Sequence, residues 1–443
     1  MAMSNTPYSV LISGAGIAGP ALAHWLSRAS FEVTIVESAP APRPGGQAVD
    51  IRGAARDVVE RMGLLPTIKA AGLNERGFAF VDEHGKRQVS MPVSFMGGEG
   101  IVAEIEILRG GLSRILHDRT CDDSDYRFDD SIESLVQDDD GVQITFLNRS
   151  PRRFDLVIGA DGVHSHVRTL AFGDGESTWV APLGGYTAYF TLPFRIETGD
   201  WFAIHNAPGG RAIGIRPGGP DTTQVMLSFL SPPLGYERQG AARQKEILRD
   251  TFAEVSWEAP RVLEEMWSAA DFYFDLVAQV RMERWTRGRV ALIGDAGYSP
   301  SPVTGLGTSL ALVGAYVLAG ELARSNGAYD VAFARYESAM RDYVKQCQEL
   351  PPLGLEGMLP RTRLAIWMRN LSMRMMTRWP VRNLVTGMFH KADAIVLEDY
   401  VASALPEPPV AAPDSPDRGD EQGPLQPVAA VAGRQAATAR CRG

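Results

Sequence analysis

Three glycines near the N-terminus have the spacing of a loop that binds a pyrophosphate. Gly14, Gly16 and Gly19 follow the short apolar run 10–12 and lead into a segment with helical periodicity. In such a loop the first glycine permits a tight turn, the second lets the pyrophosphate approach the backbone, and the third lets the helix pack closely on the strand. Because the N-terminus of that helix would face the phosphates, the sequence predicts a dinucleotide site here.

Glu37 indicates which dinucleotide fits this loop. It ends a second apolar strand, residues 32–36, where an acidic side chain can accept hydrogen bonds from the adenosine ribose. An acidic residue at this position disfavours the 2′-phosphate of NADP. The pattern therefore favours NAD or FAD.

Two further segments each combine an apolar strand with a glycine turn and an acidic residue. The first spans residues 155–162 and places Asp161 in the turn, and the second spans residues 288–296 and places Asp295 at the end of the strand. Both lead into helices, through Ser165 and Arg168 after the first segment, and through Pro302, Gly305 and Gly307 after the second. Three ordered motifs predict one extended site more specifically than any one of them.

With these motifs in this order, the sequence resembles the group A FAD-dependent aromatic monooxygenases, the para-hydroxybenzoate hydroxylase-like family. Within that family it is most similar to tetracycline-inactivating and polyketide-tailoring enzymes. The resemblance covers about residues 8–350 and is weak across the middle of the chain. It implies FAD as the bound cofactor, NADPH or NADH as co-substrate, and an aromatic small molecule and O2 as partners. Since the cofactor carries such chemistry, no catalytic side chain is assigned.

The resemblance also implies roles for individual residues. Glu37 would bind the adenosine ribose, Asp50 and Arg109 would contact FAD, and Asp295 would accept hydrogen bonds from its ribityl or pyrophosphate hydroxyls. Arg43 matches a position associated with NADPH, and a solvated loop residue is the alternative interpretation. The expected cofactor-binding residues are Gly14, Gly16, Gly19, Glu37, Arg43, Asp50, Arg109, Asp161, Asp295, Pro302, Gly305 and Gly307.

Two positions depart from the family's pattern. The family has a histidine shortly after the aspartate of its third motif, whereas this chain has Gly297-Tyr298. The family's asparagine after the Gly-x-Gly is Ser309 here. These changes concern local flavin contacts. The helix that opens at Gly307 keeps its N-terminal dipole, which would stabilise negative charge on a reduced flavin.

Other chemistry has less support in the sequence. His164-Ser165-His166 has no third ligand in reach, so we expect no metal site. A basic amphipathic stretch within residues 361–382 could lie weakly on a membrane surface, but we expect its apolar face to pack on the protein.

Composition and charge exclude further classes. The 443 residues include 44 basic and 53 acidic side chains, and the formal net charge of −9 disfavours binding to nucleic acid. The longest uncharged stretch, residues 296–320, is interrupted by prolines and glycines, so we expect no transmembrane segment. Residues 1–9 carry no positive charge ahead of the apolar run, so we expect no signal peptide. The three cysteines are odd in number and share no metal-ligand spacing, which favours a reducing, cytoplasmic location.

The elements that must position these motifs predict an α/β fold. We expect a Rossmann-like FAD-binding domain, an inserted and mostly antiparallel β-sheet substrate domain, and C-terminal helices. Small hairpins are expected around residues 77–89 and 131–147. The expected division is a discontinuous FAD-binding domain at 1–178 and 281–350, a substrate domain at 179–280, C-terminal helices at 351–404 and a disordered tail at 405–443.

The resemblance implies an FAD-dependent monooxygenase that uses NAD(P)H and O2. It would hydroxylate an aromatic or enolic, polycyclic small molecule through a flavin C4a-hydroperoxide, as a monomer or homodimer. Two alternatives remain open at this point. One is a flavin oxidase or dehydrogenase that transfers no oxygen, and the other is a non-catalytic flavin-binding or ligand-binding protein.

Overall fold

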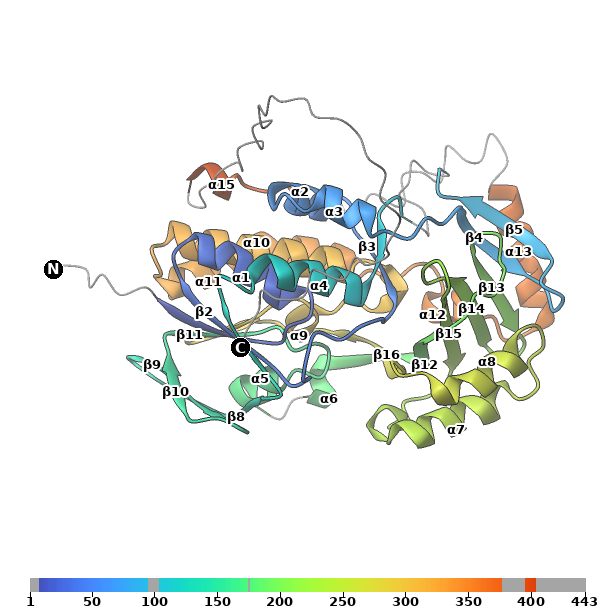
Figure 1. Ribbon diagram of the computed structural model, residues 1–443, viewed down its shortest axis with the longest axis horizontal. Helices are drawn as coiled ribbons and strands as arrows, with labels where there is room; N and C mark the ends of the chain where they lie inside the picture. Colours follow the sequence, from blue (N-terminus) through green and yellow to red (C-terminus); the bar gives the residue numbers. More distant parts are fainter. Residues whose placement is uncertain (1–7, 95–102, 174–175, 377–394, 404–443) are drawn as a thin grey trace, which may run out of the picture.

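The computed structural model describes residues 8–94, 103–173, 176–376 and 395–403. The disordered tail expected at residues 405–443 and the end of the basic stretch, residues 377–382, lie outside these described residues. Two large sheets, of six and seven strands, lie next to each other along the long axis of the molecule (Figure 1). The predicted α/β class is confirmed.

The six-stranded sheet has the order β17-β18-β11-β1-β2-β7 and is parallel except for the pair of β17 with β18. Helices α1, α4 and α10 cover one of its faces (Figure 1). Its strands are β1 (Ser9–Ser13), β2 (Glu32–Glu37), β7 (Asp125–Phe128), β11 (Leu156–Gly159), β17 (Thr286–Arg287) and β18 (Val290–Leu292). The helices on this side of the molecule are α1 (Ala18–Arg28), α4 (Arg109–Thr120), α10 (Gly307–Arg324) and α11 (Tyr329–Cys347).

Burial on both faces explains the continuous apolar runs of the central strands. Val10, Leu11 and Ile12 of β1 are all fully buried, and Ile12 pairs with Ile35 of β2. A parallel strand covered on both faces has no polar side, so its sequence does not alternate. The strand, glycine turn and helix predicted at the N-terminus are confirmed.

The seven-stranded sheet has the order β16-β12-β15-β14-β13-β4-β5 and is antiparallel except for the pair of β13 with β4. Its strands are β4 (Gly77–Val81), β5 (Arg87–Pro92), β12 (Val180–Leu192), β13 (Trp201–Ala207), β14 (Arg211–Pro217), β15 (Thr223–Leu230) and β16 (Tyr273–Val280). The hairpin of β4 and β5 comes from residues 77–92, which the expected division placed in the FAD-binding domain. All five residues of β4 are buried, so this strand needs a neighbour on each side and finds the second one in β13.

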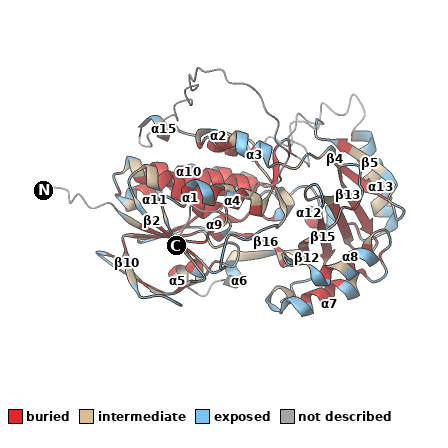
Figure 2. Cartoon of the chain, in the orientation of Figure 1, coloured by how far each residue is buried: buried red, intermediate tan, exposed pale blue. Residues whose placement is uncertain are grey.

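The two faces of the seven-stranded sheet have different partners. Along β12, Tyr186, Ala188 and Phe190 belong to a core completed by α7 (Ala241–Phe252) and α8 (Ala259–Glu265). Thr187 and Tyr189 alternate with them and point to the other face. On that other face, α12 (Gly354–Met358) packs on β12 and α13 (Arg363–Met376) packs on β5, and Figure 2 shows α7 and α13 with exposed outer surfaces.

Smaller elements complete the fold around the two large sheets. The hairpin predicted near residues 131–147 is part of a three-stranded sheet of β8 (Ile132–Asp138), β9 (Gly141–Phe146) and β10 (Arg152–Phe154). The strands β3 (Ala48–Asp50) and β6 (Glu106–Leu108) form a pair. The remaining helices are α2 (Ala54–Arg61), α3 (Leu65–Ala70), α5 (His166–Phe172), α6 (Glu176–Trp179), α9 (Asp295–Tyr298) and α15 (Tyr400–Ser403). None of the helices that the structure describes has the length and apolarity to cross a bilayer.

The glycine turn provides a test of the packing between β1 and α1. A Cβ atom added to Gly19 would lie 2.0 Å from the carbonyl oxygen of Gly14, whereas one added to Gly16 would meet only the guanidinium end of Arg109, at 3.2 Å. Backbone cannot yield as a flexible side chain can. We therefore expect Gly19→Ala to lower the free energy of unfolding by about 1–3 kcal/mol, and Gly16→Ala to change it by less than about 0.5 kcal/mol. Denaturant unfolding followed by circular dichroism measures both, and equal losses would contradict this packing.

Candidate functional site

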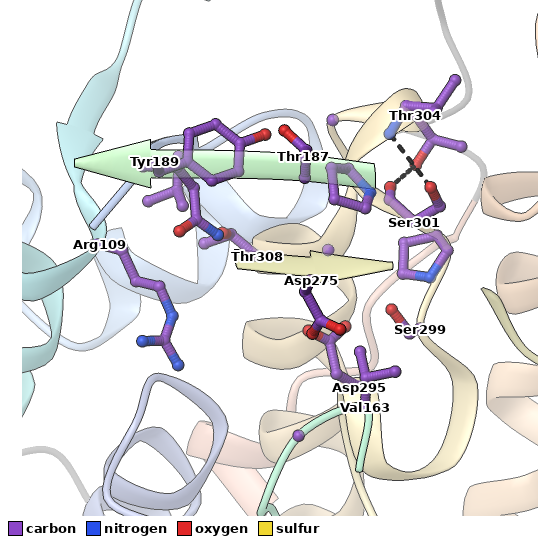
Figure 3. Close-up of a pocket in the computed structure, with 18 of the residues that line it drawn as sticks. Arg109, Val163, Thr187, Tyr189, Asp275, Asp295, Ser299, Ser301, Thr304 and Thr308 are labelled. Atoms are coloured by element: carbon purple, nitrogen blue, oxygen red, sulfur yellow. Dashed lines mark hydrogen bonds between the residues drawn. The ribbon is translucent and has the colours of Figure 1, made fainter. Parts of the chain in front are cut away.

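A single large cavity brings the predicted residues together. Its volume is about 1870 Å³, and it runs from the glycine turn of β1 to the face of the seven-stranded sheet that carries Thr187 and Tyr189. Every predicted cofactor residue lines this cavity except Gly19, whose place against Gly14 is a packing requirement. Figure 3 shows part of this cavity, with Thr187 and Tyr189 in the upper part of the view and Arg109, Asp275 and Asp295 below them.

The conformation of the glycine turn is fixed by backbone hydrogen bonds and by the side chain of Glu37. Gly14 has a φ of +109°, in the left-handed region that favours glycine, and its N–H donates to the carbonyl of Val36 at 2.8 Å. The carboxylate of Glu37 accepts from the N–H of Ala15 and from the N–H of Ala39, both at 2.9 Å. Glu37 is thereby fixed at the end of β2, beside the turn.

Two arginines flank this turn. Arg109 begins α4, and its guanidinium lies near Gly16. The hydroxyl of Ser113, one helical turn later, donates to the carbonyls of Ala15 and Gly16, each at 3.1 Å. Arg43 is 64% exposed and lies 3.5 Å from the carboxylate of Glu37. Arg109 is therefore an internal cation of the site, whereas Arg43 lies at its rim.

Asp161 has a structural function in addition to its place on the cavity wall. Its carboxylate accepts from the hydroxyl of Ser165 at 2.5 Å and from the N–H groups of His166 and Val167 at 2.9 and 3.0 Å. These donors are at the N-terminus of α5, where unpaired N–H groups need acceptors. The second motif thus uses its acidic residue to begin a helix.

Arg168 joins the second motif to the third. This side chain is fully buried and donates to the carbonyl of Ala296 at 2.9 Å and to the carbonyl of Val163 at 2.6 Å. Ala296 directly follows Asp295. The buried arginine therefore fixes the backbone that carries Asp295.

Asp295 lies where the cavity meets the N-terminus of α10. Its exposed surface opens into the cavity, and the protein around it raises the pKa of its carboxyl through burial, against the opposing effects of Ser299 and Arg109. Gly305 has a φ of +68°, and Gly307 begins the 18-residue helix α10. The partial positive charge at this helix end faces the site.

The two positions that depart from the family's pattern have structural explanations. Tyr298 is fully buried, points away from the cavity and accepts a hydrogen bond from the hydroxyl of Tyr336 at 2.8 Å. A Cβ atom at Gly314 would lie 2.1 Å from the Tyr298 hydroxyl, so glycine on α10 makes room for this ring. Ser309 is also buried and donates to the carbonyl of Arg52 at 3.4 Å.

Sequence reasoning missed a buried charge cluster around Asp50. Arg216 of β14 donates to both carboxylate oxygens of Glu75, at 2.6 and 2.8 Å, and to Glu106 at 2.7 Å. Arg52 lies 2.6 Å from Asp50. Burial raises the pKa of Asp50 to about 8, the adjacent Glu106 carboxylate adds to this rise, and Arg52 opposes it. Burial also raises the pKa of Glu106, so this pair holds a proton near neutral pH.

A second missed array joins the two large sheets. The imidazole Nε2 of His164, in the loop after β11, lies 3.0 Å from the carboxylate of Asp275, and the hydroxyl of Tyr273 donates to the same carboxylate at 2.6 Å. All three residues line the cavity. Their separation in sequence, 111 residues between His164 and Asp275, hides the array from local patterns. No group of three or more metal-ligating side chains is found among the described residues.

Comparison with known proteins identifies the family. A family model described as an FAD binding domain matches residues 7–349. A flavin-dependent monooxygenase of Legionella longbeachae is 38% identical over 345 residues, which cover 77% of this chain and 87% of that protein. This chain belongs to the family of FAD-dependent monooxygenases.

Two further comparisons give a sequence relative and a similar solved structure. A Mycobacterium tuberculosis protein is 42% identical over 353 residues, covering 80% of this chain and 95% of that one. The crystal structure of tetracycline destructase Tet(51) matches with a TM-score of 0.76 and 32% identity, covering 89% of this chain and 100% of that one. The predicted family, fold class and FAD cofactor are confirmed.

The site of this monooxygenase suits FAD by its own chemistry. Gly16 lines the cavity beside the guanidinium of Arg109, where a pyrophosphate could approach the backbone, and Glu37 offers a carboxylate for ribose hydroxyls. Arg109 and the N-terminus of α10 supply positive charge where phosphates and a reduced ring carry negative charge.

The proton on Asp50 predicts a pH dependence of stability in the FAD-free protein. The unfolded chain ionises this carboxyl near its ordinary value of 3.8, whereas the folded protein keeps the proton up to about pH 8. Stability from this group is therefore complete at low pH and is lost as the pH rises over this interval. The side chain of Asp50→Asn stays neutral at every pH. We therefore expect the free energy of unfolding of this variant, measured relative to that of wild type, to rise by at least about 1 kcal/mol between pH 4 and pH 8.

The control for this measurement is Glu104→Gln. Glu104 is an exposed carboxylate beside Arg56 and Lys69, so its variant should follow the wild-type pH profile. Urea unfolding at a series of pH values provides the comparison. Parallel curves for wild type and Asp50→Asn would contradict a proton held at Asp50.

Proposed function

We propose that this monooxygenase uses NADPH or NADH and O2 to hydroxylate a polycyclic aromatic or enolic small molecule. The observation that carries the proposal is the single cavity shared by the cofactor motifs and the face of the seven-stranded sheet. Its volume of about 1870 Å³ exceeds the roughly 300–1,000 Å³ of a pocket for one small ligand. A cofactor and a sizeable substrate can therefore lie together in it.

We assign the cofactor half of the cavity by chemistry. Glu37 accepts hydrogen bonds from the adenosine ribose, Arg109 pairs with the pyrophosphate, and Asp295 accepts from hydroxyls of the ribityl chain. FAD, when bound, supplies the electrons that activate O2. The N-terminus of α10, at Gly307, stabilises negative charge on the reduced ring.

The wall of the substrate half of the cavity is mostly apolar, with a few polar and charged side chains among its residues. Its wall includes Tyr189, Phe202, Met226, Met358 and Met373. Methionines and aromatic rings suit a large flat ligand whose shape needs adaptable packing. The match at 32% identity to a protein named tetracycline destructase supports a polycyclic substrate. We propose that the hairpin 77–92, through its pairing with β13, belongs with the substrate domain.

The reaction type is tested by labelled oxygen. We expect turnover under ¹⁸O2, with NADPH and a substrate that accelerates its oxidation, to give a product with one ¹⁸O atom by mass spectrometry, because a flavin monooxygenase transfers one atom of O2 to its substrate. The control is the same reaction in H2¹⁸O with unlabelled O2, which should leave the product unlabelled. Unlabelled product with stoichiometric hydrogen peroxide would favour an oxidase, and no NADPH oxidation with any compound would favour a binding protein.

Arg43 is the proposed contact for the nicotinamide coenzyme. The chain has one glycine fingerprint, already assigned to FAD, so the coenzyme must bind transiently at a rim such as that formed by Arg43. We expect Arg43→Ala to raise the KM for NADPH by about three- to tenfold without changing the FAD content. Arg114→Ala, an exposed arginine on α4 that does not line the cavity, is the matched control. Unchanged rates of flavin reduction in stopped flow would remove Arg43 from this role.

A further inference from the structure

Two arginines line the substrate half of the cavity, and their charges are balanced differently. Arg216 lies on β14 and pairs with Glu75 through two hydrogen bonds and with Glu106 through a third. Its positive charge is therefore already matched by carboxylates. An acidic group of a substrate would gain little from it.

Arg369 on α13, in contrast, has only neutral partners in the part of the chain that the structure describes. Its guanidinium carbon lies 3.7 Å from the ring centroid of Phe80. It donates to the Asn206 side-chain oxygen at 2.9 Å, to the Met358 carbonyl at 3.2 Å, and to the side chain of the adjacent Asn370. All these acceptors are neutral, and no carboxylate pairs with Arg369 among the described residues.

The surroundings make this unmatched charge costly. Burial lowers the pKa of Arg369 to about 10, so it is still charged at neutral pH. The nearby cavity wall is formed by Met358, Met368 and Met373. A cation in a partly dry, apolar setting is stabilised by an anion that enters with it.

We propose that Arg369 is the subsite that binds an ionised acidic group, a carboxylate or a deprotonated enol, of an aromatic substrate. This assignment rests on the proposed function and specifies the substrate class of the same cavity. Arg369 is at the end of the cavity formed by α13, far from α1 and the start of the six-stranded sheet (Figure 1). The acidic end of the substrate would therefore point away from the cofactor, and the opposite end toward it.

A binding experiment with the FAD-loaded enzyme tests this without turnover. The probes are 1-hydroxy-2-naphthoate and its neutral isostere 1-hydroxy-2-naphthamide, titrated against the flavin absorbance. We expect wild type to bind the acid roughly tenfold or more tightly than the amide, as a charge-assisted pair requires. Arg369→Gln keeps a polar hydrogen-bonding end on a shorter side chain and removes the charge, so the preference should vanish, whereas Arg369→Lys should keep part of it.

The matched control is Arg374→Gln on the same helix. Arg374 is exposed, bonds to the carbonyl and side chain of Gln88 and does not line the cavity, so its variant should keep the wild-type ratio of affinities. FAD content and melting temperature show whether each variant is folded. Equal affinities of wild type for acid and amide, no binding of the acid in the millimolar range, or an unchanged ratio in Arg369→Gln would each overturn the proposal.

The anion that binds Arg369 could also be a phosphate of the coenzyme. A second part of the experiment distinguishes this source from the substrate. NADPH is titrated against wild type and Arg369→Gln without oxygen. Weaker NADPH binding together with an unchanged acid-to-amide ratio would assign Arg369 to a phosphate and overturn the substrate subsite. Because these are binding measurements, the absence of oxygen transfer would refute the proposed function while leaving this test intact.

Discussion

The site depends on the parallel contact of three strands, β1, β11 and β18. Each strand ends in one of the three motifs, and neighbouring parallel strands end at the same edge of a sheet. The contact is close: a Cβ atom at Gly14 would lie 2.5 Å from the carbonyl oxygen of Ala160. Segments separated by more than a hundred residues therefore meet at one place, and the cavity forms there.

Much of this arrangement could be predicted because it is local. The apolar run before Gly14, the acidic residue that ends β2 and the helix that opens at Gly307 are each short patterns with a physical reason. The antiparallel strands between residues 180 and 280 are similarly visible as runs bounded by glycine and proline.

What could not be predicted depends on contacts between distant segments. The pairing of β4 with β13 has no signal in the hairpin itself, because a buried strand in an isolated hairpin has the same sequence as one inside a sheet. The array of His164, Tyr273 and Asp275 likewise appears only when the two sheets meet. Asp161 was expected beside the cofactor, but a sequence does not show that its oxygens already cap α5.

The buried junction between the two large sheets contains more carboxyl groups than arginines. Glu75, Glu106 and Asp50 face Arg52 and Arg216, so full ionisation would leave a buried excess of one negative charge, and one proton shared by Asp50 and Glu106 removes it. Asp50 also lies against Gly305, where a Cβ atom would be 3.3 Å from its carboxylate. The carboxyl of Asp50, which takes part in holding this proton, therefore lies next to the loop that leads into α10.

The fit of Tyr298 against Gly314 has a consequence for exchanging segments among members of this family. The ring of Tyr298 occupies the space that a side chain at position 314 would need, so the residue types at these two positions depend on each other although they lie 16 positions apart in the sequence. A chimera that imports histidine at 298 alone would leave a void beneath α10, and one that imports a larger residue at 314 alone would collide with the tyrosine. Ancestral reconstruction or shuffling of this fold should therefore inherit the two positions as a linked pair.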